Sequence, residues 1–306
     1  MSSFLRKMFL GSVLILVAAF IGLATRPVMG GNYLTLAALK DIFKSPTITL
    51  FSKKEMMQSF LKIDIAERLS GRDNVKTCQV GEYSFAVQHA AIAKNLLIDF
   101  FIRQDYYFPY QATNPFIIDC GANVGFTTAY FKFRYPDATI FAFEPDPINF
   151  SLLEKNMATA KFKNVVLHKK AVAAVAGELN FGGAGTTSSL MHDSEASDNM
   201  IKVEAVTLSS YIDKPVDILK MDIEGAESQV LKELDTTNKI SFVKNIIMEF
   251  HYTASNPNAL GAILTMLERR NFQYHIKSVS GMTQDFNCHE RVSKTLNCLM
   301  IYAYQI

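Results

Sequence analysis

The feature that most constrains the fold is a short apolar strand that ends in an acid and leads at once into a small-residue turn and a helix. Residues 116–125 read FIIDCGANVG, with residues 116–118 as the strand and Asp119 at its carboxyl end. Gly121, Ala122 and Gly125 let the backbone turn tightly and let a ligand approach it closely. This arrangement predicts an open α/β sheet that binds its ligand at the carboxyl ends of the strands. The glycine spacing is GxxxG and not GxGxxG, which favours a nucleoside ligand without a pyrophosphate.

A second strand with an acid at its end follows in the sequence FAFEPDP. Residues 139–143 predict the strand, and Glu144 lies 25 residues after Asp119. A ribose-binding acid is expected about 20 residues beyond such a turn, and a carboxylate can accept two hydrogen bonds from a ribose diol. Alternatively, Glu144 provides a negative charge before the helix that begins near Pro147. Together with the first turn, its position favours the ribose role.

The third motif, DILKMDIEGAESQVL at residues 217–231, again joins an apolar strand, acids and a glycine that opens a helix. If the strand continues through the acids, Lys220, Asp222 and Glu224 alternate and point to one face. Three charges on one face of a core strand are costly to bury without partners. We therefore expect them to face a cleft or one another.

The fourth motif, NIIMEFHY at residues 245–252, predicts another buried strand that ends in Glu249 and His251. These two side chains share one face of the strand. A single histidine in a protein core is usually structural. A histidine at the end of an apolar strand, in a chain with several strands that end in acids, is a better functional candidate.

The order DCGANVG, FEPDP, LKMDIEGAE and IMEFHY resembles the FkbM family of class I, S-adenosylmethionine-dependent methyltransferases. The resemblance covers roughly residues 80–280, and KMDIEGAE is its most specific part. It implies an α/β, Rossmann-like fold with a seven-stranded, mostly parallel sheet, helices on both faces and an antiparallel last strand. It also implies methyl transfer to a hydroxyl, commonly on a sugar, a glycolipid or a polyketide.

The resemblance also implies roles for individual residues. The cofactor turn would comprise Asp119, Gly121, Ala122, Asn123 and Gly125, with Asp119 near the amino-acid end of the methyl donor. The ribose hydroxyls would bind to Glu144. The adenine would be bordered by Pro145 and Asp146 on one side and by Ala171 and Val172, after the strand VVLHKKAV, on the other. The donor methyl would lie close to Asp222 and Glu224.

Proton removal from the acceptor needs a base, and His251 is the first choice because an unperturbed imidazole titrates near neutral pH. Asp222 is the alternative, either as the base or as the group that orients His251. Lys220 is expected to pair with one of the acids, in the site or as a plain structural ion pair. Asp222, Glu224, Glu249 and His251 would also suit Mg²⁺ or Mn²⁺, and less well zinc. Their spacing does not distinguish a metal site from a proton-transfer network.

The N-terminus predicts a membrane segment. Arg6 and Lys7 precede residues 8–24, a stretch of 17 apolar or small residues without charge or proline. This length is at the lower limit for a membrane span. The stretch is slightly long for the apolar centre of a signal peptide, which favours an uncleaved single-pass anchor, but Gly22 and Ala24 also fit a cleavage site. The side of the membrane on which the rest of the chain lies stays open.

We therefore expect three parts: an anchor at residues 1–25, a linker with a helical and hairpin preamble at 26–109, and a methyltransferase domain at 110–306. In the preamble we expect helices at residues 52–70 and 89–104 and a hairpin across Gly81 and Glu82. Residues 177–207 predict two strands around a polar loop in which Ser188 and Ser189 could help to position the acceptor. Cys120 should be a buried free thiol, and Cys288 and Cys298 could pair in an oxidising compartment.

The expected partners are a small-molecule or glycan acceptor and a membrane. A net charge of +2 and the lack of a long basic run do not favour nucleic acid. The oligomeric state stays open. Two alternatives to an O-methyltransferase remain: an NAD-dependent oxidoreductase on a similar sheet, weakened by the absent third glycine, and a membrane-tethered scaffold that kept the fold and lost activity.

Overall fold

The computed structural model describes residues 53–70, 76–182, 200–252, 258–278 and 297–305. The chain divides into two compact units, residues 1–47 and 48–306, and all described residues belong to the second. The segment at residues 8–24 lies outside the described residues, so the membrane anchor stays a prediction. Among the helices that the structure does describe, none is long and apolar enough to cross a membrane.

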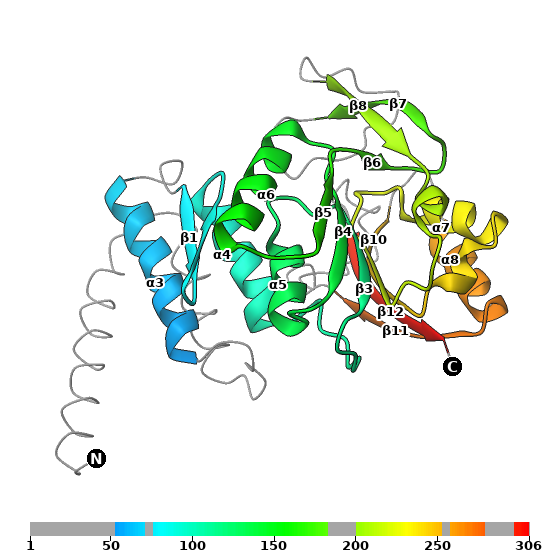
Figure 1. The fold of residues 1–306 in the computed structure, drawn as a ribbon, viewed down its shortest axis with the longest axis horizontal. Coiled ribbons are helices and arrows are strands. Elements are labelled where there is room, and N and C mark those ends of the chain that lie inside the picture. The colour runs from blue at the N-terminus through cyan, green and yellow to red at the C-terminus, as the bar shows by residue number, and fades with distance from the viewer. Residues whose placement is uncertain (1–52, 71–75, 183–199, 253–257, 279–296, 306) are drawn as a thin grey trace, which may run out of the picture. The chain divides into compact units, whose positions relative to one another are not determined.

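A seven-stranded sheet forms the centre of the described unit (Figure 1). Its strands, in spatial order, are β11 (Phe272–Ser278), β12 (Asn297–Gln305), β10 (Asn245–Tyr252), β9 (Ile218–Met221), β3 (Phe116–Cys120), β4 (Thr139–Phe143) and β5 (Val165–His168). The strands from β10 to β5 pair in parallel, and β12 is antiparallel to both of its neighbours. The predicted mostly parallel sheet with an antiparallel last strand is therefore confirmed.

Helices cover both faces of this sheet. Figure 1 shows α5 (Phe126–Arg134) and α6 (Pro147–Ala160) on one side and α7 (Glu227–Thr236) and α8 (Ala259–Arg269) on the other. The central strands β3 and β9 are buried at every position, as expected for parallel strands between two helical layers. Short 3₁₀ helices, η3 (Leu208–Tyr211) and η4 (Lys239–Phe242), flank the segment that leads through β9 and α7.

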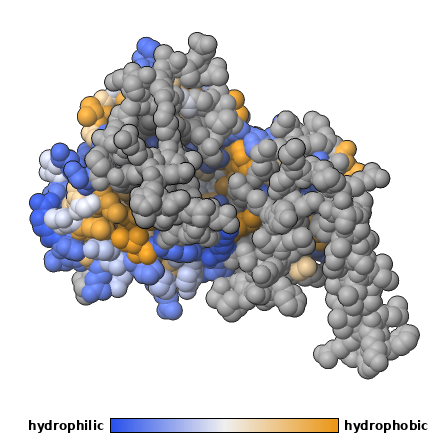
Figure 2. Space-filling model, turned by 180° about the vertical axis from the view of Figure 1, so that it is seen from behind, coloured by the Kyte–Doolittle hydropathy of each residue, from blue (hydrophilic) through white to orange (hydrophobic). Residues whose placement is uncertain are grey.

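A large apolar core lies between the sheet and the layer of α7 and α8. It contains Leu219 and Ile246 from the strands and Val230 and Leu267 from the helices, all fully buried. On α8, Ile263 and Met266 are buried with Leu267, and Leu260 and Leu264 are partly buried against the same core. Viewed from behind, hydrophilic residues line much of the edge of the described part, and hydrophobic ones gather toward the middle (Figure 2).

The first strand-to-helix turn requires its two glycines for packing. Gly121 and Gly125 have φ values of +79° and +91°, which L side chains rarely adopt. A Cβ atom at Gly121 would lie 1.8 Å from the backbone oxygen of Asp222, and one at Gly125 would press on Leu153 and Met157 of α6. The sequence analysis assigned these glycines to the tight turn and to ligand approach. The structure adds that they let the turn pack against β9 and α6.

The preamble packs directly on the sheet domain. It comprises α3 (Lys53–Ser70), the hairpin of β1 (Thr77–Val80) and β2 (Tyr83–Ala86), and α4 (Ala90–Leu96), which continues as the π-helical segment η2 (Leu97–Ile102). The hairpin turns at Gly81 and Glu82 as predicted. Asn156 of α6 accepts a hydrogen bond from the Ala86 N–H and donates to the carbonyl oxygens of Ala86 and Val124. One buried amide thus joins the hairpin to the first turn of the sheet domain.

A small three-stranded sheet lies beside the main one. In it β8 (Met200–Val206) pairs in parallel with β6 (Ala171–Val172) and antiparallel with β7 (Gly177–Gly182). The expected strand VVLHKKAV is therefore divided, because β5 ends at His168 and Ala171 joins the second sheet. The two strands predicted within residues 177–207 are confirmed. Ser188, Ser189 and Cys288 lie outside the described residues, so their predicted roles stay predictions.

Candidate active site

A cleft lies at the carboxyl ends of the strands, where the first turn meets β4 and the small sheet. Its volume is about 560 Å³ when the part open to solvent is included. Its lining includes seven residues that the sequence predicted beside the methyl donor: Gly121, Asn123, Glu144, Pro145, Ala171, Val172 and Asp222. The aromatic rings of Phe143 and Phe181 also line it. We call this space the first cleft.

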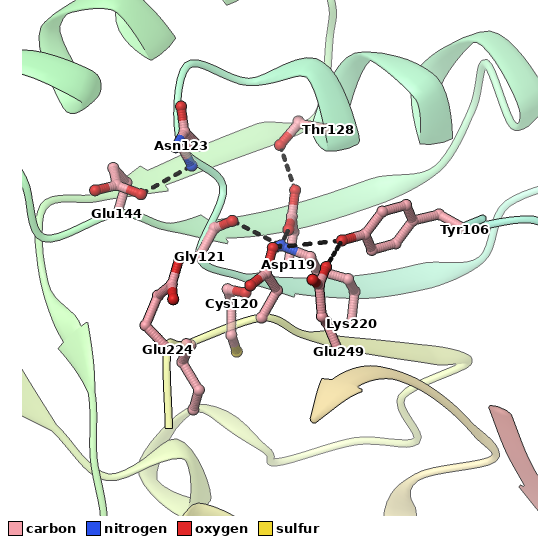
Figure 3. Close-up of polar contacts among 12 residues, drawn as sticks. Tyr106, Asp119, Cys120, Gly121, Asn123, Thr128, Glu144, Lys220, Glu224 and Glu249 are labelled. Atoms are coloured by element: carbon pink, nitrogen blue, oxygen red, sulfur yellow. Dashed lines mark hydrogen bonds and ion pairs between the residues drawn. The ribbon is translucent and has the colours of Figure 1, made fainter. Parts of the chain in front are cut away.

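Glu144 links the first cleft to the glycine turn. Its carboxylate oxygens accept hydrogen bonds from the Asn123 N–H at 2.8 Å and from the Asp146 N–H at 2.9 Å (Figure 3 shows the first). Burial raises the pKa of Glu144 to about 7, against the opposing effect of these two amides. Each carboxylate oxygen has a second lone pair, so Glu144 can hold the turn and still accept a hydrogen bond from a ligand hydroxyl.

Asp146 does not line the first cleft. It is fully buried, and its side chain accepts hydrogen bonds from the N–H groups of Ile148 and Asn149, which makes it the N-cap of α6. The side chain of Asp146 therefore caps α6 and does not face the first cleft, and its place beside the adenine stays a prediction. The helix-capping role that the sequence analysis weighed for Glu144 belongs to the acid two residues later.

A buried ion pair lies beneath the turn. The Nζ of Lys220 donates to the carbonyl oxygens of Cys120 at 3.1 Å and Gly121 at 2.6 Å, and it lies 3.3 Å from Asp119 (Figure 3). Thr128 donates to the other Asp119 oxygen at 2.7 Å. Burial alone would lower the pKa of Lys220, but the charges of Asp119 and Asp222 raise it.

Asp119 and Lys220 are both completely buried, and neither lines the first cleft. This arrangement favours a positioning role for Lys220, and the expected place of Asp119 near the amino-acid end of the methyl donor stays a prediction. The sequence also allowed Lys220 to form a plain structural ion pair. Cys120, the next residue of β3, is a buried free thiol as predicted, and burial raises its pKa.

A second cavity opens on the preamble side of the same turn, with a volume of about 990 Å³ when the part open to solvent is included. We call it the second cavity. Its polar lining includes Asp222 and Glu224, which also line the first cleft, and Glu249 and His251 from the end of β10. Two spaces thus meet at the acids of the third motif. Glu249 and His251 share a strand face as predicted.

The acids of the third motif come together in a different way from the one expected. β9 ends at Met221, so Glu224 does not follow from strand alternation. Its φ of +55° belongs to the left-handed region, and the turn brings its carboxylate within 3.4 Å of His251 Nε2. Lys220 lies 3.6 Å from Asp222, which agrees with the expected pairing of these two residues.

His251 is surrounded by carboxylates. Its Nδ1 lies 2.9 Å from Glu227 Oε1, and its Nε2 lies 4.0 Å from the nearest oxygens of both Asp222 and Glu249. Burial alone would lower its pKa, but the hydrogen bonds with Cys298 and Glu227 and the nearby negative charges raise the pKa of His251 to about 12. The imidazole therefore holds its proton at neutral pH. A raised pKa makes His251 a weaker candidate for the general base than the sequence predicted, and its role stays a prediction.

Two glutamates of the site have the near-neutral pKa that the sequence predicted for His251. Burial, followed by the charge of Asp222, raises the pKa of both Glu224 and Glu249 to about 7. The Tyr106 hydroxyl donates to Glu249 at 2.9 Å (Figure 3). The same hydroxyl lies 3.3 Å from Asp222. A general base is most effective with a pKa near the working pH, so the glutamates meet this requirement.

The residues expected to suit a metal do gather in one place. Asp222, Glu224 and His251 have ligand atoms within 4.8 Å of one another, and so do Glu249, His251 and Cys298. A metal would have to displace the proton from His251, because only a neutral imidazole binds metals. These distances fit a proton-transfer network as well as a metal site.

Sequence reasoning did not assign roles to two residues of the site. Tyr106 was one of six aromatic residues before the first core strand, and nothing local distinguished it. Glu227 lies at the start of α7, is completely buried, and accepts hydrogen bonds from the N–H groups of Ile223 and Gly225 besides contacting His251. Its position just after the motif's glycine was the available signal.

Comparisons with known proteins agree with this geometry. Residues 119–274, about half of the chain, match the family described as the methyltransferase FkbM domain. Methyltransferase 1 of Beauveria bassiana is 26% identical over 208 residues, which are 59% of this chain and 81% of that protein. The hexuronic acid methyltransferase AglP of Haloferax volcanii is 28% identical over 137 residues, 44% of this chain and 54% of that protein.

Among solved structures, the FkbM methyltransferase of Methylobacillus flagellatus is 15% identical, with a TM-score of 0.44 over 70% of this chain and 54% of that one. The family match covers the first cleft, the turn at Glu224 and the whole of β10. This match favours a methyltransferase over the NAD-dependent oxidoreductase that the sequence also allowed, since the matched family transfers methyl groups. The chain belongs to the FkbM family of methyltransferases.

Proposed function

We propose that this protein is an S-adenosylmethionine-dependent O-methyltransferase that acts on a hydroxyl of a sugar-containing acceptor. The observation that carries the proposal is the meeting of two spaces at Asp222 and Glu224. The first cleft would hold the methyl donor and the second cavity the acceptor. An acid able to take a proton then lies where the two reactants meet.

The first cleft fits the donor by its chemistry. The Glu144 carboxylate offers free lone pairs to a ribose diol, and Phe143, Pro145, Ala171 and Val172 give apolar walls for a purine. The open backbone of the turn at Gly121 and Asn123 continues toward Asp222. When bound, S-adenosylmethionine supplies an electrophilic methyl group on a sulfonium, so the protein's task is alignment and proton removal.

We propose Glu224 as the general base. It borders both spaces, and its pKa of about 7 leaves it partly ionised at neutral pH. Asp222 is held by Lys220 and Tyr106, which favours an orienting role. His251 keeps its proton and anchors Glu224 through Nε2, and Glu227 fixes the ring from the opposite side. The acceptor's proton would pass to Glu224 as the oxygen attacks the methyl carbon.

Two further parts of the proposal concern the acceptor and the membrane. A sugar-containing acceptor is supported by the Haloferax relative, whose name states that it methylates a hexuronic acid. The membrane tether is supported by the uncharged stretch at residues 8–24 behind Arg6 and Lys7. We expect the full chain to stay with membranes after carbonate extraction. Release together with loss of residues 1–24 would indicate a cleaved signal peptide instead.

The test of the proposed activity has two steps. Isothermal titration with S-adenosylmethionine and with NAD should give binding of the methyl donor and none of NAD. Radiolabelled methyl transfer into a membrane and glycan extract should then give a labelled product. Binding without any transfer would support the inactive scaffold, and binding of NAD alone would reject the proposal.

The substitution Glu144→Ala tests the donor site by itself. It removes the acceptor for a ribose hydroxyl and leaves the Asn123 N–H unpaired. We expect donor binding to weaken by about 1–3 kcal/mol, the usual effect of losing hydrogen bonds to a charged group. Glu154→Ala, on the exposed side of α6, is the matched control. Unchanged affinity of Glu144→Ala would remove this residue from the ribose role.

A further inference from the structure

Acidic side chains outnumber basic ones in the lining of the second cavity. Five carboxyl groups line it: Asp99, Asp105, Asp222, Glu224 and Glu249. Burial raises the pKa of Asp99 to about 7, as it does for Glu224 and Glu249, so these three are partly ionised at neutral pH. Among the described residues, His251 is the one basic side chain in the lining, and no lysine or arginine takes part. Three of these acids line the second cavity and not the first cleft: Asp99, Asp105 and Glu249. They can therefore contact only a ligand in the second cavity.

The basic side chains nearby are held by acids at the rim or beneath the turn. Arg103 lies 3.6 Å from Asp99, one turn away on the same helical segment. Lys277 of β11 binds Asp105. Lys220 is completely buried and reaches the cavity through no atom of its own. An anionic ligand in the second cavity would therefore find no free lysine or arginine among the described residues, and it would lie against several carboxylates.

The rest of the wall suits an uncharged ring. Leu96, Phe100, Phe126 and Met300 supply apolar surface, and Tyr106 stacks on Phe100 with ring centroids 4.5 Å apart. Carboxylates accept hydrogen bonds from hydroxyls in two or more directions. A wall of aromatic and aliphatic carbon beside hydrogen-bond acceptors matches a polyhydroxylated group with C–H faces.

On the basis of the proposed function, we propose that the group entering the second cavity is a neutral, hydroxyl-bearing ring such as an uncharged sugar. A carboxylate, sulfate or phosphate on that ring is excluded by like charge. The preference would be opposite to that expected from the name of the Haloferax relative, which acts on a hexuronic acid. The excluding acids include Asp99 and Asp105, which precede the segment matched to the family.

The test uses the labelled membrane and glycan extract. After methyl transfer by the full chain, the labelled acceptors are cleaved to monosaccharides and separated by anion exchange. We expect the labelled monosaccharide in the unretained, neutral fraction, at about a hundredfold excess over the retained one, because like charges in contact cost several kcal/mol. Label mainly in the retained fraction would overturn the inference.

A charge reversal sharpens the test. Asp99→Lys should raise the ratio of retained to unretained label by about tenfold, the effect of one charge pair at a partly solvated distance. Glu154→Lys makes the same change of charge on the exposed face of α6 and should leave the ratio unchanged. Equal ratios in both variants would overturn the role of Asp99. Donor titration of each variant checks its folding, and loss of donor binding in the unmodified protein would reject the proposed function itself.

Discussion

At the scale of single residues, proton transfer depends on where Glu224 lies. The left-handed turn brings this carboxylate to His251 and to both spaces of the site. Glu224→Gln keeps its size and removes the base, so we expect turnover to fall by about 10²–10⁴-fold with donor affinity retained. Because the folded pKa of Glu224 is raised to about 7, the rate of the unmodified protein should rise with pH through about 7 as the carboxyl ionises.

Glu249→Gln is the matched comparison, since Glu249 has a similar pKa but borders the second cavity only. We expect it to raise KM for the acceptor more than it lowers kcat. If Glu224→Gln keeps full turnover and Glu249→Gln loses it, the base has been assigned to the wrong glutamate. The rates are measured by methyl transfer at several acceptor concentrations between pH 5.5 and 8.5.

The second prediction at this scale concerns Lys220 and the stability of the folded protein. Its ammonium compensates the buried charge of Asp119 and ties down the carbonyl oxygens of the glycine turn. Lys220→Met would leave Asp119 buried without its counter-charge, so we expect a loss of about 3–5 kcal/mol in the free energy of unfolding. Asp119→Asn combined with Lys220→Met should recover part of that loss.

Urea unfolding followed by circular dichroism measures both Lys220 variants. Lys232→Met, at an exposed position of α7, is the control and should change the free energy of unfolding by less than about 0.5 kcal/mol. A Lys220→Met protein as stable as the control would mean that solvent or a backbone shift compensates the charge, and the buried ion pair would then not support the turn.

At the scale of elements, the sequence predicted strand ends well and turns poorly. An apolar run that ends in an acid can be read locally, and parallel pairing then brings Glu144, Asp222 and Glu249 to one edge of the sheet. The left-handed backbone at Glu224 has no comparable local signal, because its residue type does not favour that conformation.

Contacts between distant elements account for the other differences. Tyr106 reaches Glu249 across 143 positions of sequence, and Glu227 meets His251 across 24. The pKa of His251 depends on Cys298 and on the acids Asp222 and Glu227, which lie far from it in sequence, so the residue type alone suggested the opposite protonation state. The capping role of Asp146, by contrast, follows from the acid that precedes Pro147 and could have been predicted.

Asn156 is one of the side chains that join the preamble to the sheet domain. Asn156 satisfies backbone groups of Ala86 and Val124 while buried to 1% exposure. Asn156→Leu would leave these groups unpaired, so we expect a loss of about 2–4 kcal/mol in the free energy of unfolding. Thr159→Ala, on the exposed side of the same helix, should have little effect. Limited proteolysis should cut the variant first within residues 71–90, and an unchanged cleavage pattern would contradict this joint.

At the scale of the whole molecule, the acids of the site set how stability depends on pH. Folding raises the pKa of Glu144, Glu224 and Glu249 from 4.5 to about 7, so between these values the folded protein binds more protons than the unfolded chain. His251 acts in the same direction above its ordinary pKa of 6.5, because folding raises that pKa to about 12. Stability should therefore fall as pH rises from about 5 to 8.

Asp217 changes the pH dependence of stability in the opposite direction. Its hydrogen bonds with Lys244 and Tyr110 lower its pKa in spite of burial. Its contribution is present above its ordinary pKa of 3.8 and is lost as pH falls below that value. The two effects together place the optimum of the ligand-free protein on the acid side of neutrality. The expected decline is up to about 1.4 kcal/mol per pH unit for each additional proton that the folded state holds.

Thermal unfolding of the ligand-free protein between pH 4.5 and 8.5 measures this profile. Replacing Glu224 and Glu249 together by glutamine should flatten the decline between pH 5 and 7, because the two raised carboxyls no longer titrate. The positively charged sulfonium of the methyl donor should flatten it in the unmodified protein as well, since it compensates the carboxylates that it approaches. A ligand-free protein that gains stability from pH 5 to 8 would show that these acids ionise at their ordinary pKa values, and the electrostatic basis for Glu224 as the base would be lost.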